Sequence, residues 1–174
     1  QTVDFEFATQ RRLEYGHDIK VPQPPFWGAR VINQVQIKSL VPYLNERMLY
    51  QFHWGYRKDG KRLDEYMEWA KNELRPILYE LLETVVRDDI LQPQAVYGFW
   101  RVAAEGNDIV LFGEDEHSEL GRFTLPRQLN SDRLCLADFF RDMSQGPSER
   151  DVIGLQVVTM GQKVADIARG WFAE

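Results

Sequence analysis

The chain has 174 residues and a formal net charge of −6, with 44% hydrophobic and 28% charged residues, a composition typical of soluble globular proteins. An acidic chain repels phosphate backbones, which argues against a nucleic-acid partner. Cys135 is the only cysteine, which excludes an intrachain disulfide and a cysteine-rich metal site. No apolar run approaches the roughly 18 residues of a membrane helix, and the N-terminus lacks a signal-peptide pattern. We therefore expect a cytoplasmic protein.

The first third of the chain predicts an arm, a strand and a helix. The first 20 residues mix charged and aromatic side chains without a clear period, which predicts an extended arm. The prolines of VPQPP (residues 21–25) exclude a helix or a central strand. Residues 29–37 alternate apolar and polar side chains, which predicts a strand. Ser39 is then expected to cap a helix that runs through Phe52 and stops at Gly55.

The rest of the chain predicts one long helix, then strands, then a final helix. Residues 61–89 carry an apolar stripe at helical spacing, and Pro76 should kink or divide this helix. Residues 95–104 and 108–112 predict a hairpin. Further strands are expected at 122–126 and 152–161, a short helix or turn at 133–142, and a helix from residue 162. Strands clustered between helices predict an α+β fold with a mainly antiparallel twisted sheet, flanking helices and an extended Pro-rich N-terminal arm.

The residues that could carry chemistry do not form a self-sufficient pattern. His17, His53 and His117 are far apart and lack the spacing of metal ligands. Cys135 lies between leucines, as a buried structural thiol does. The acids of GEDEHSEL (residues 113–120) lack the spacing of a calcium loop and predict a charged hairpin loop. Asp138 either caps a helix or meets a basic partner. An enzyme that uses Asp138 and His53 is disfavoured because no general-base arrangement can be argued.

The most distinctive stretch is YLNERMLYQFHWGYRK (residues 43–58), which holds five aromatic side chains, a histidine and Asn45. It predicts either a core helix that runs into a turn or the wall of a pocket for a flat ligand. Neither phosphate-binding glycine pattern is present. The residues alone thus favour a binding or docking module over a stand-alone hydrolase.

Six segments in this order resemble the activation domain of cobalamin-dependent methionine synthase. They are PPFWGARV, YLNERMLYQFHWGYRK, PQAVYGFWRVAAEGNDIVLF, RFTLPRQ, LCLADFF and DVIGLQVVTMGQ, and they run from about Pro22 to the end of the chain. The resemblance implies a module that presents S-adenosylmethionine for the reductive methylation of cob(II)alamin, with cobalt and the sulfonium carrying the chemistry. It also implies no catalytic residue in this chain.

The resemblance also implies cofactors and partners. Cobalamin would be bound by a neighbouring domain, zinc would occur only in the homocysteine domain of the full enzyme, and flavodoxin or a similar reductase would supply the electron. Residues 1–21 would be the linker from a preceding cobalamin-binding domain, and residues 22–174 would be an activation-domain fragment that lacks the downstream half. The alternative is a non-catalytic module that docks on a cobalamin protein or a flavodoxin-type reductase without binding the methyl donor.

Asn45 is the one position that the resemblance places in the ligand site. The family binds the amino group of its ligand through an acid in a Tyr-Ile-Asp type motif, and the matching triplet here is Tyr43-Leu44-Asn45. An amide oxygen can still accept from an ammonium group, but without charge assistance. Another residue would then supply the charge, or the contact would be weaker. The competing interpretation is that Asn45 only caps or solvates the start of a helix.

Overall fold

The computed structural model describes residues 5–14, 20–129 and 132–171. The chain divides into two compact units. Unit 1 comprises the described residues up to Val31 together with Val96–Val157, and unit 2 comprises Ile32–Ala95 together with the described residues from Val158 onward.

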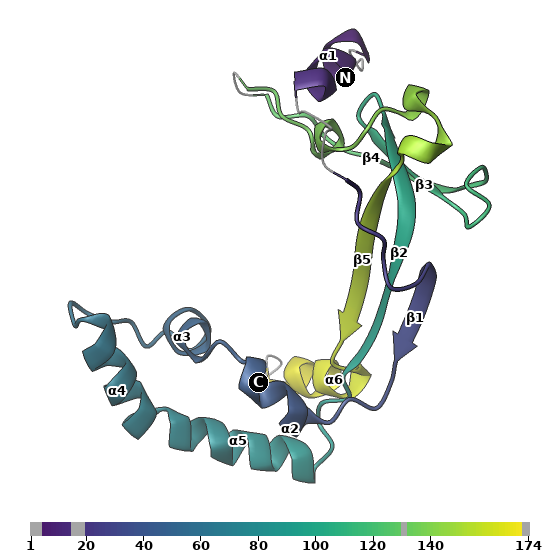
Figure 1. Ribbon diagram of the computed structural model, residues 1–174. Coiled ribbons are helices and arrows are strands. Elements are labelled where there is room, and N and C mark those ends of the chain that lie inside the picture. Colours follow the sequence, from purple (N-terminus) through teal and green to yellow (C-terminus); the bar gives the residue numbers. More distant parts are fainter. Residues whose placement is uncertain (1–4, 15–19, 130–131, 172–174) are drawn as a thin grey trace. The chain divides into compact units, whose positions relative to one another are not determined.

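Unit 1 is built on a five-stranded sheet whose central strand is β2 (Gln94–Glu105). Three strands pair with β2, namely β1 (Gly28–Ile32), β3 (Asp108–Phe112) and β5 (Asp151–Thr159), while β4 (Glu119–Thr124) pairs with β3. Figure 1 shows β2 running between β1 and β5. The β2–β3 and β3–β4 pairs are antiparallel. The predicted α+β class with a mainly antiparallel sheet is confirmed.

The predicted hairpin is present, and both faces of its strands are buried. Glu105 pairs with Asp108, so only Gly106 and Asn107 form the turn. One face of the hairpin contributes Val102, Ala104, Ile109 and Leu111 to a core with Cys135 and Ala137, and the other face buries Ala103, Val110 and Phe112. At the other end of β2, a Cβ on Gly98 would lie 2.2 Å from the Gly28 carbonyl oxygen, so only glycine allows β1 to approach this closely.

The expected strand boundaries need correction. β1 ends at Ile32 instead of residue 37, because Gln34 adopts a positive φ of 57° that breaks the extended backbone. β4 begins at Glu119 and ends at Thr124, where 122–126 was expected, and a register shift lies between Leu111 and Phe112 on its partner β3. The last strand and the final helix, α6 (Gln162–Trp171), lie where the sequence predicts them.

The N-terminal expectation is wrong for residues 5–14, which form the helix α1 (Phe5–Glu14) instead of an extended arm. Its apolar pattern is weak, and contacts with distant residues stabilise it instead. Arg12 is 1% exposed and bonds to groups of unit 1, as described below. The Pro-rich stretch at residues 20–27 forms neither helix nor strand, as predicted.

The helical pattern of residues 61–89 is confirmed, including its division by proline. α4 (Leu63–Glu73) and α5 (Arg75–Arg87) meet at Leu74, and Pro76 lies in the first turn of α5, where its missing N–H has no partner to lose. Tyr50, Tyr66, Ala70, Leu74 and Leu78 form the core of unit 2. Among the described residues, no helix combines the length and apolar character needed to cross a membrane.

The single helix expected from Ser39 to Phe52 is wrong. The segment forms four short pieces: α2 (Ile37–Leu40), a 3₁₀ turn η1 (Val41–Tyr43), α3 (Glu46–Met48) and a π-helical turn η2 (Leu49–His53). Ser39 lies inside α2 and its hydroxyl donates to the Gln36 carbonyl at 2.7 Å, so it does not cap a helix. The residue that does cap one is Asn45.

Candidate functional site

Asn45 lies at the break between η1 and α3. Its side-chain Oδ1 accepts a hydrogen bond from the backbone N–H of Met48 at 3.0 Å, which is the geometry of an N-cap. The side chain is exposed. The capping interpretation of Asn45 is therefore confirmed. It leaves the ligand interpretation open, because an amide oxygen has two lone pairs and the cap occupies one.

The acid next to Asn45 is already paired. Glu46 Oε2 accepts from Arg75 Nη2 at 2.8 Å and Nε at 3.1 Å, and from the Tyr50 hydroxyl at 3.4 Å. Burial, followed by the nearby Glu46 carboxylate, raises the pKa of Tyr50 to about 12, so the phenol stays protonated. Hydrogen bonding to Glu46 in turn raises the pKa of Arg75. The charge of Glu46 is thus largely compensated within unit 2 before any ligand arrives.

The aromatic stretch around Asn45 has a buried face and an exposed face. Tyr50 is fully buried and packs on Trp54, with ring centroids 5.3 Å apart. By contrast, Tyr43 is 86% exposed and Phe52 is 68% exposed. Of the two interpretations of this stretch, packing accounts for the first face. Leu44 and Met48, which lie close to Asn45 in the sequence, are exposed as well, so apolar side chains near Asn45 are available for contact.

The π-helical turn η2 follows α3, the short helix that Asn45 caps. A π turn adds a residue to the helical repeat and so rotates the side chains that follow it, and such turns are frequent at functional sites. Here it lets Tyr50 face the core while Phe52 and His53 remain exposed. Hydrophobic periodicity gives no signal for this feature, which is why the sequence predicted one continuous helix.

Asp138 combines the two roles that the sequence left open. Its carboxylate accepts from Arg127 Nη1 at 2.6 Å and Nη2 at 2.5 Å, and from the Cys135 backbone N–H at 3.0 Å. It lies in the 3₁₀ turn η3 (Leu136–Phe139), and neither partner of the ion pair is more than 8% exposed. Asp138 is therefore a buried structural acid, held by a cap contact and a basic partner together.

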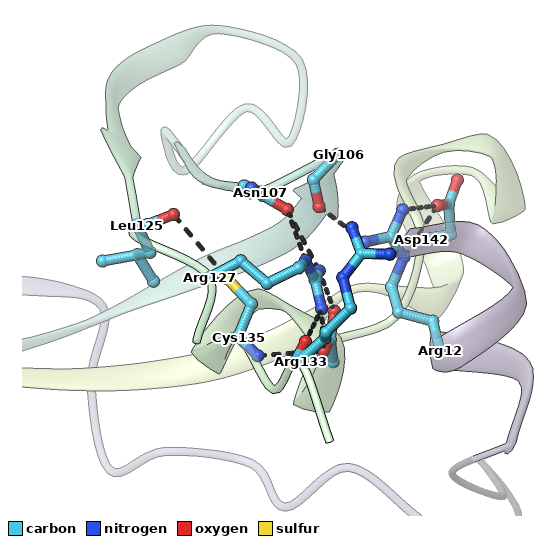
Figure 2. A network of polar contacts seen from close by, with 9 residues as sticks. Arg12, Gly106, Asn107, Leu125, Arg127, Arg133, Cys135 and Asp142 are labelled. Atoms are coloured by element: carbon cyan, nitrogen blue, oxygen red, sulfur yellow. Dashed lines mark hydrogen bonds and ion pairs between the residues drawn. The ribbon is translucent and has the colours of Figure 1, made fainter. Parts of the chain in front are cut away.

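The ion pair belongs to a larger network that surrounds the β2–β3 turn (Figure 2). Arg127 also donates to Asn107 Oδ1 at 3.1 and 3.0 Å. Arg12 of α1 donates to the Gly106 carbonyl at 2.8 Å and to Asp142 Oδ2 at 2.6 and 2.9 Å. Burial alone would raise the pKa of Asp142, but hydrogen bonds from Ser144 and then from Arg12 lower it overall. Both residues of the turn are thus held by arginines that arrive from elsewhere in the chain.

The remaining candidates contribute no site. Cys135 is 2% exposed and its Sγ lies 3.8 Å from the Leu125 carbonyl oxygen, which confirms a buried structural thiol. His53 and His117 are exposed, and His17 lies outside the described residues. Within the described parts of the chain, no three His, Cys, Asp or Glu side chains gather into a set that could hold a metal.

The acidic loop is a charged hairpin loop, as predicted. It joins β3 to β4, and the Asp115 carboxylate accepts from the Ser118 hydroxyl and from the backbone N–H groups of Ser118 and His117 at 2.9 and 3.0 Å. These hydrogen bonds, the Ser118 hydroxyl foremost, lower the pKa of Asp115 to about 2. The acid serves to close the loop on itself.

The fold and these contacts define an α+β protein in which Asp138, Asp142 and Glu46 are each paired with an arginine. Residues 36–174 match the family described as vitamin B12 dependent methionine synthase, activation domain. The chain belongs to this family.

Relatives and solved structures extend the match. The chain is 38% identical over 168 residues to the methionine synthase of Mycobacterium tuberculosis (strain ATCC 25618 / H37Rv), which covers 93% of this chain and 14% of that protein. It is 39% identical over 155 residues to the methionine synthase of Mycobacterium leprae (strain TN), which covers 86% and 13%. A crystal structure of the MetH reactivation domain bound to AdoHcy matches with a TM-score of 0.75 and 19% identity, over 98% of this chain and 54% of that one. At that identity the structural likeness shows a shared fold.

Breaking the buried ion pair should destabilise the protein strongly. We expect Arg127→Met to lower the free energy of unfolding by about 3–5 kcal/mol, because it leaves the Asp138 carboxylate buried without its cation. Arg122→Met is the matched control, since Arg122 also bonds acids beside this hairpin but its side chain is 33% exposed, and it should cost about 1 kcal/mol or less. Urea denaturation followed by circular dichroism measures both. The interpretation fails if the two variants cost the same, or if Arg127→Met/Asp138→Asn recovers none of the loss.

The Asp115 carboxyl should titrate near pH 2 in the folded protein. Its pKa is below the value of about 3.9 for an unperturbed aspartate. The loop contacts therefore stabilise the folded protein at a pH above about 3.9. This contribution to stability is lost as the pH falls toward 2. Ser118→Ala removes the main donor, so we expect the pKa of Asp115 to rise toward the unperturbed value. Carbon-detected NMR of the carboxyl group measures both titrations, and an unchanged midpoint in Ser118→Ala would contradict the assignment.

Proposed function

We propose that this chain is the N-terminal part of an activation domain that presents S-adenosylmethionine for the reductive methylation of cob(II)alamin in a cobalamin-dependent methionine synthase. The observation that carries the proposal is the family match over residues 36–174. The solved domain of the same fold, which is described as bound to AdoHcy, supports a ligand of this class. AdoHcy is what remains of S-adenosylmethionine after its methyl group is transferred.

The proposal assigns the segments of the chain as parts of a larger enzyme. Residues 1–21 join a preceding cobalamin-binding domain, and residues 22–174 are the first part of the activation domain. The small shares of two similar proteins that the chain covers support this assignment. The match covers 14% of the Mycobacterium tuberculosis relative and 54% of the solved reactivation domain. Cobalamin is then bound by the neighbouring domain, and zinc belongs to the homocysteine domain of the full enzyme. The whole assembly is expected in the cytoplasm.

In this role the residues of the chain position the ligand, while the sulfonium and the cobalt supply the chemistry. Asn45 is proposed to accept a hydrogen bond from the ligand's ammonium group. Asn45 is exposed and its Oδ1 is oriented by the cap contact with Met48, which leaves the second lone pair of this oxygen for a ligand. The neighbouring Glu46 adds little charge, because Arg75 pairs with it at 2.8 Å. The contact therefore lacks the charge assistance that an acid at position 45 would give.

The 174-residue chain should bind S-adenosylmethionine weakly or not at all, since the downstream half of the domain is proposed to supply most of the site. In a chain extended by that half, we expect Asn45→Asp to tighten binding about fivefold to tenfold, because it converts a neutral acceptor into a charged one. Isothermal titration calorimetry with both chains measures this. Low-micromolar binding by the 174-residue chain would contradict the division of the site.

Two control variants separate the capping role of Asn45 from the ligand role. Asn45→Ser retains the ability to cap but has a shorter side chain, so it should weaken binding while stability stays nearly unchanged. Asn45→Ala removes the cap and should lower the free energy of unfolding by about 1 kcal/mol. If Asp, Ser and Asn at position 45 all give the same affinity in the extended chain, Asn45 is not part of the ligand site.

A reductase such as flavodoxin is the proposed electron donor, and Arg57, Lys58, Lys61 and Arg62 are its candidate docking cluster. All four are exposed. Lys61 lies over the Trp69 ring at 5.1 Å, and Arg62 pairs with Asp64 at 2.9 Å on the surface. This is the densest group of cations in a chain whose net charge is −6. Such clusters mainly raise the rate at which a charged partner associates.

Reversing the charge of this cluster should slow reductive activation of the full enzyme. We expect a loss of about tenfold at low salt that shrinks at high salt, as screening removes steering. Reversal of Lys71, Arg87, Lys163 and Arg169 changes the net charge equally and is the control. An unchanged rate at low salt, or an equal loss in the control, would rule the cluster out.

The second candidate is a docking module that binds a cobalamin protein or a flavodoxin-type reductase without the methyl donor. The observation that favours it is Asn45, which lacks the charge of the family's acid and serves as a cap. The flanking gene sequence separates the two candidates. An Arg-Pro-rich segment after Glu174 and a cobalamin-binding D-x-H-x-x-G segment before Gln1 support the first, and a stop codon after Glu174 supports the second.

A further inference from the structure

Unit 1 contains a cavity of about 290 Å³ whose lining is strongly basic. Its charged lining residues are Lys20, Arg101, Arg150 and Glu116. Three cations therefore face one acid, although the chain as a whole has a net charge of −6. Trp27 and Ser148 also contribute to the walls. A local excess of positive charge in a concave, partly desolvated space attracts anions more strongly than the same charges do on open surface.

Arg150 lines this cavity with a buried donor that has no acceptor. Its side chain has neither a hydrogen bond nor an ion pair with any residue that the structure describes, and its Nη1 is buried without an acceptor. The guanidinium carbon lies 3.3 Å from the centroid of the Phe112 ring, which fixes the group in place. Burial lowers the pKa of Arg150, and the cation of Arg101 adds to this effect while the acids Glu116 and Asp115 oppose it. A buried donor without an acceptor is costly unless something that enters the site satisfies it.

Arg101 is held beside Arg150 by two contacts of its own. Its guanidinium lies 4.0 Å from the centroid of the Trp27 ring and pairs with Glu116 at 2.7 Å. Its side chain is 21% exposed, and that of Glu116 is 40% exposed. The two guanidinium groups that line this cavity, those of Arg101 and Arg150, thus each stack on an aromatic ring. Two oriented guanidinium groups are the usual protein device for binding carboxylate or phosphate through paired hydrogen bonds.

We propose that this cavity binds a small oxyanion, a carboxylate or phosphate group, between Arg150 and Arg101 with Lys20 at its side. The anion supplies the countercharge that Arg150 lacks and shares Arg101 with Glu116. The volume accommodates a group of metabolite size. All the lining residues belong to unit 1, while Asn45 belongs to unit 2, so the two proposed contacts are made by different residues.

Titration of the chain with inorganic phosphate and with acetate tests the proposal. Sodium chloride keeps the ionic strength constant, and the ¹⁵Nε signal of Arg150 and the indole N–H of Trp27 are followed by NMR. We expect saturable shifts at both residues. Tighter binding of phosphate identifies a phosphate-bearing ligand, whereas equal or tighter binding of acetate identifies a carboxylate. Shifts that never saturate with either anion, or that chloride reproduces, overturn the proposal.

Arg30→Met is the matched control for Arg150→Met. Arg30 also belongs to unit 1 and lies 3.8 Å from the centroid of a phenylalanine ring, Phe26, but it does not line the cavity. Methionine keeps contact with the ring in both variants and removes the charge. We expect Arg150→Met to weaken phosphate binding about tenfold or more, and Arg30→Met to leave it unchanged. Equal weakening in both would show non-specific attraction and overturn the site.

Arg150→Lys covers the case in which Arg150→Met does not fold. Lysine keeps the charge but not the planar fork, so binding should weaken less than in the methionine variant. The circular dichroism spectrum verifies the fold of each variant. Wild-type affinity in Arg150→Lys together with wild-type affinity in Arg101→Lys would overturn the assignment of these two guanidinium groups.

Discussion

The two-residue turn between β2 and β3 is where the buried polar network of unit 1 connects segments that are distant in the sequence. Arg12 donates to the carbonyl of Gly106, and Arg127 donates to the side chain of Asn107. The same two arginines pair with Asp142 and Asp138. A helix from the N-terminus and two segments that follow β4 are thus fastened to one turn. Buried charges of this kind are tolerated only as complete networks, because removing one partner leaves the other desolvated and unpaired.

The same principle limits what position 45 can do in unit 2. The ion pair between Arg75 and Glu46 ties the broken segment around Asn45 to the start of α5. The Tyr50 hydroxyl lies 3.4 Å from the same carboxylate oxygen, within the core. This ion pair stabilises the segment, but it also neutralises Glu46, the acid next to Asn45. A cationic group that approaches Asn45 therefore meets an oriented amide and a compensated carboxylate.

The elements that the sequence predicts well are those whose signals are local. The stripe of residues 61–89 and the effect of Pro76 depend on the chain's own periodicity, and the turn at Gly106 and Asn107 depends on residue type. The prediction for α1 fails because this helix is held by contacts across 94 and 130 positions of the sequence, and no local pattern encodes such contacts. The prediction for residues 37–53 fails because hydrophobic periodicity gives no signal for the π turn η2.

The functional groups follow the same rule. Asp138 was recognisable as a charge in an apolar setting, but its partner Arg127 is not marked by any spacing. Arg101 and Arg150 are 49 positions apart in numbering and look like ordinary surface cations in the sequence. The missing signal is the aromatic ring under each guanidinium, Trp27 and Phe112, which only the folded chain brings into place. Only the family resemblance points to Asn45 as a ligand contact. From the sequence, a ligand contact and a helix cap are both possible for this residue, and the structure shows the cap.

The fold does not determine whether asparagine or aspartate stands at position 45. Asparagine and aspartate cap helices about equally well, so the contact with Met48 does not distinguish them. A carboxylate at this position would in addition attract an ammonium group by its charge. Asparagine keeps the first function and gives up the charge. In the proposed role of Asn45, the difference between the two residues is therefore expressed in the affinity for a cationic ligand and not in the stability of the helix. If the proposed ligand contact is made at position 45, exchanging Asn for Asp there changes the affinity and leaves the cap of α3 in place.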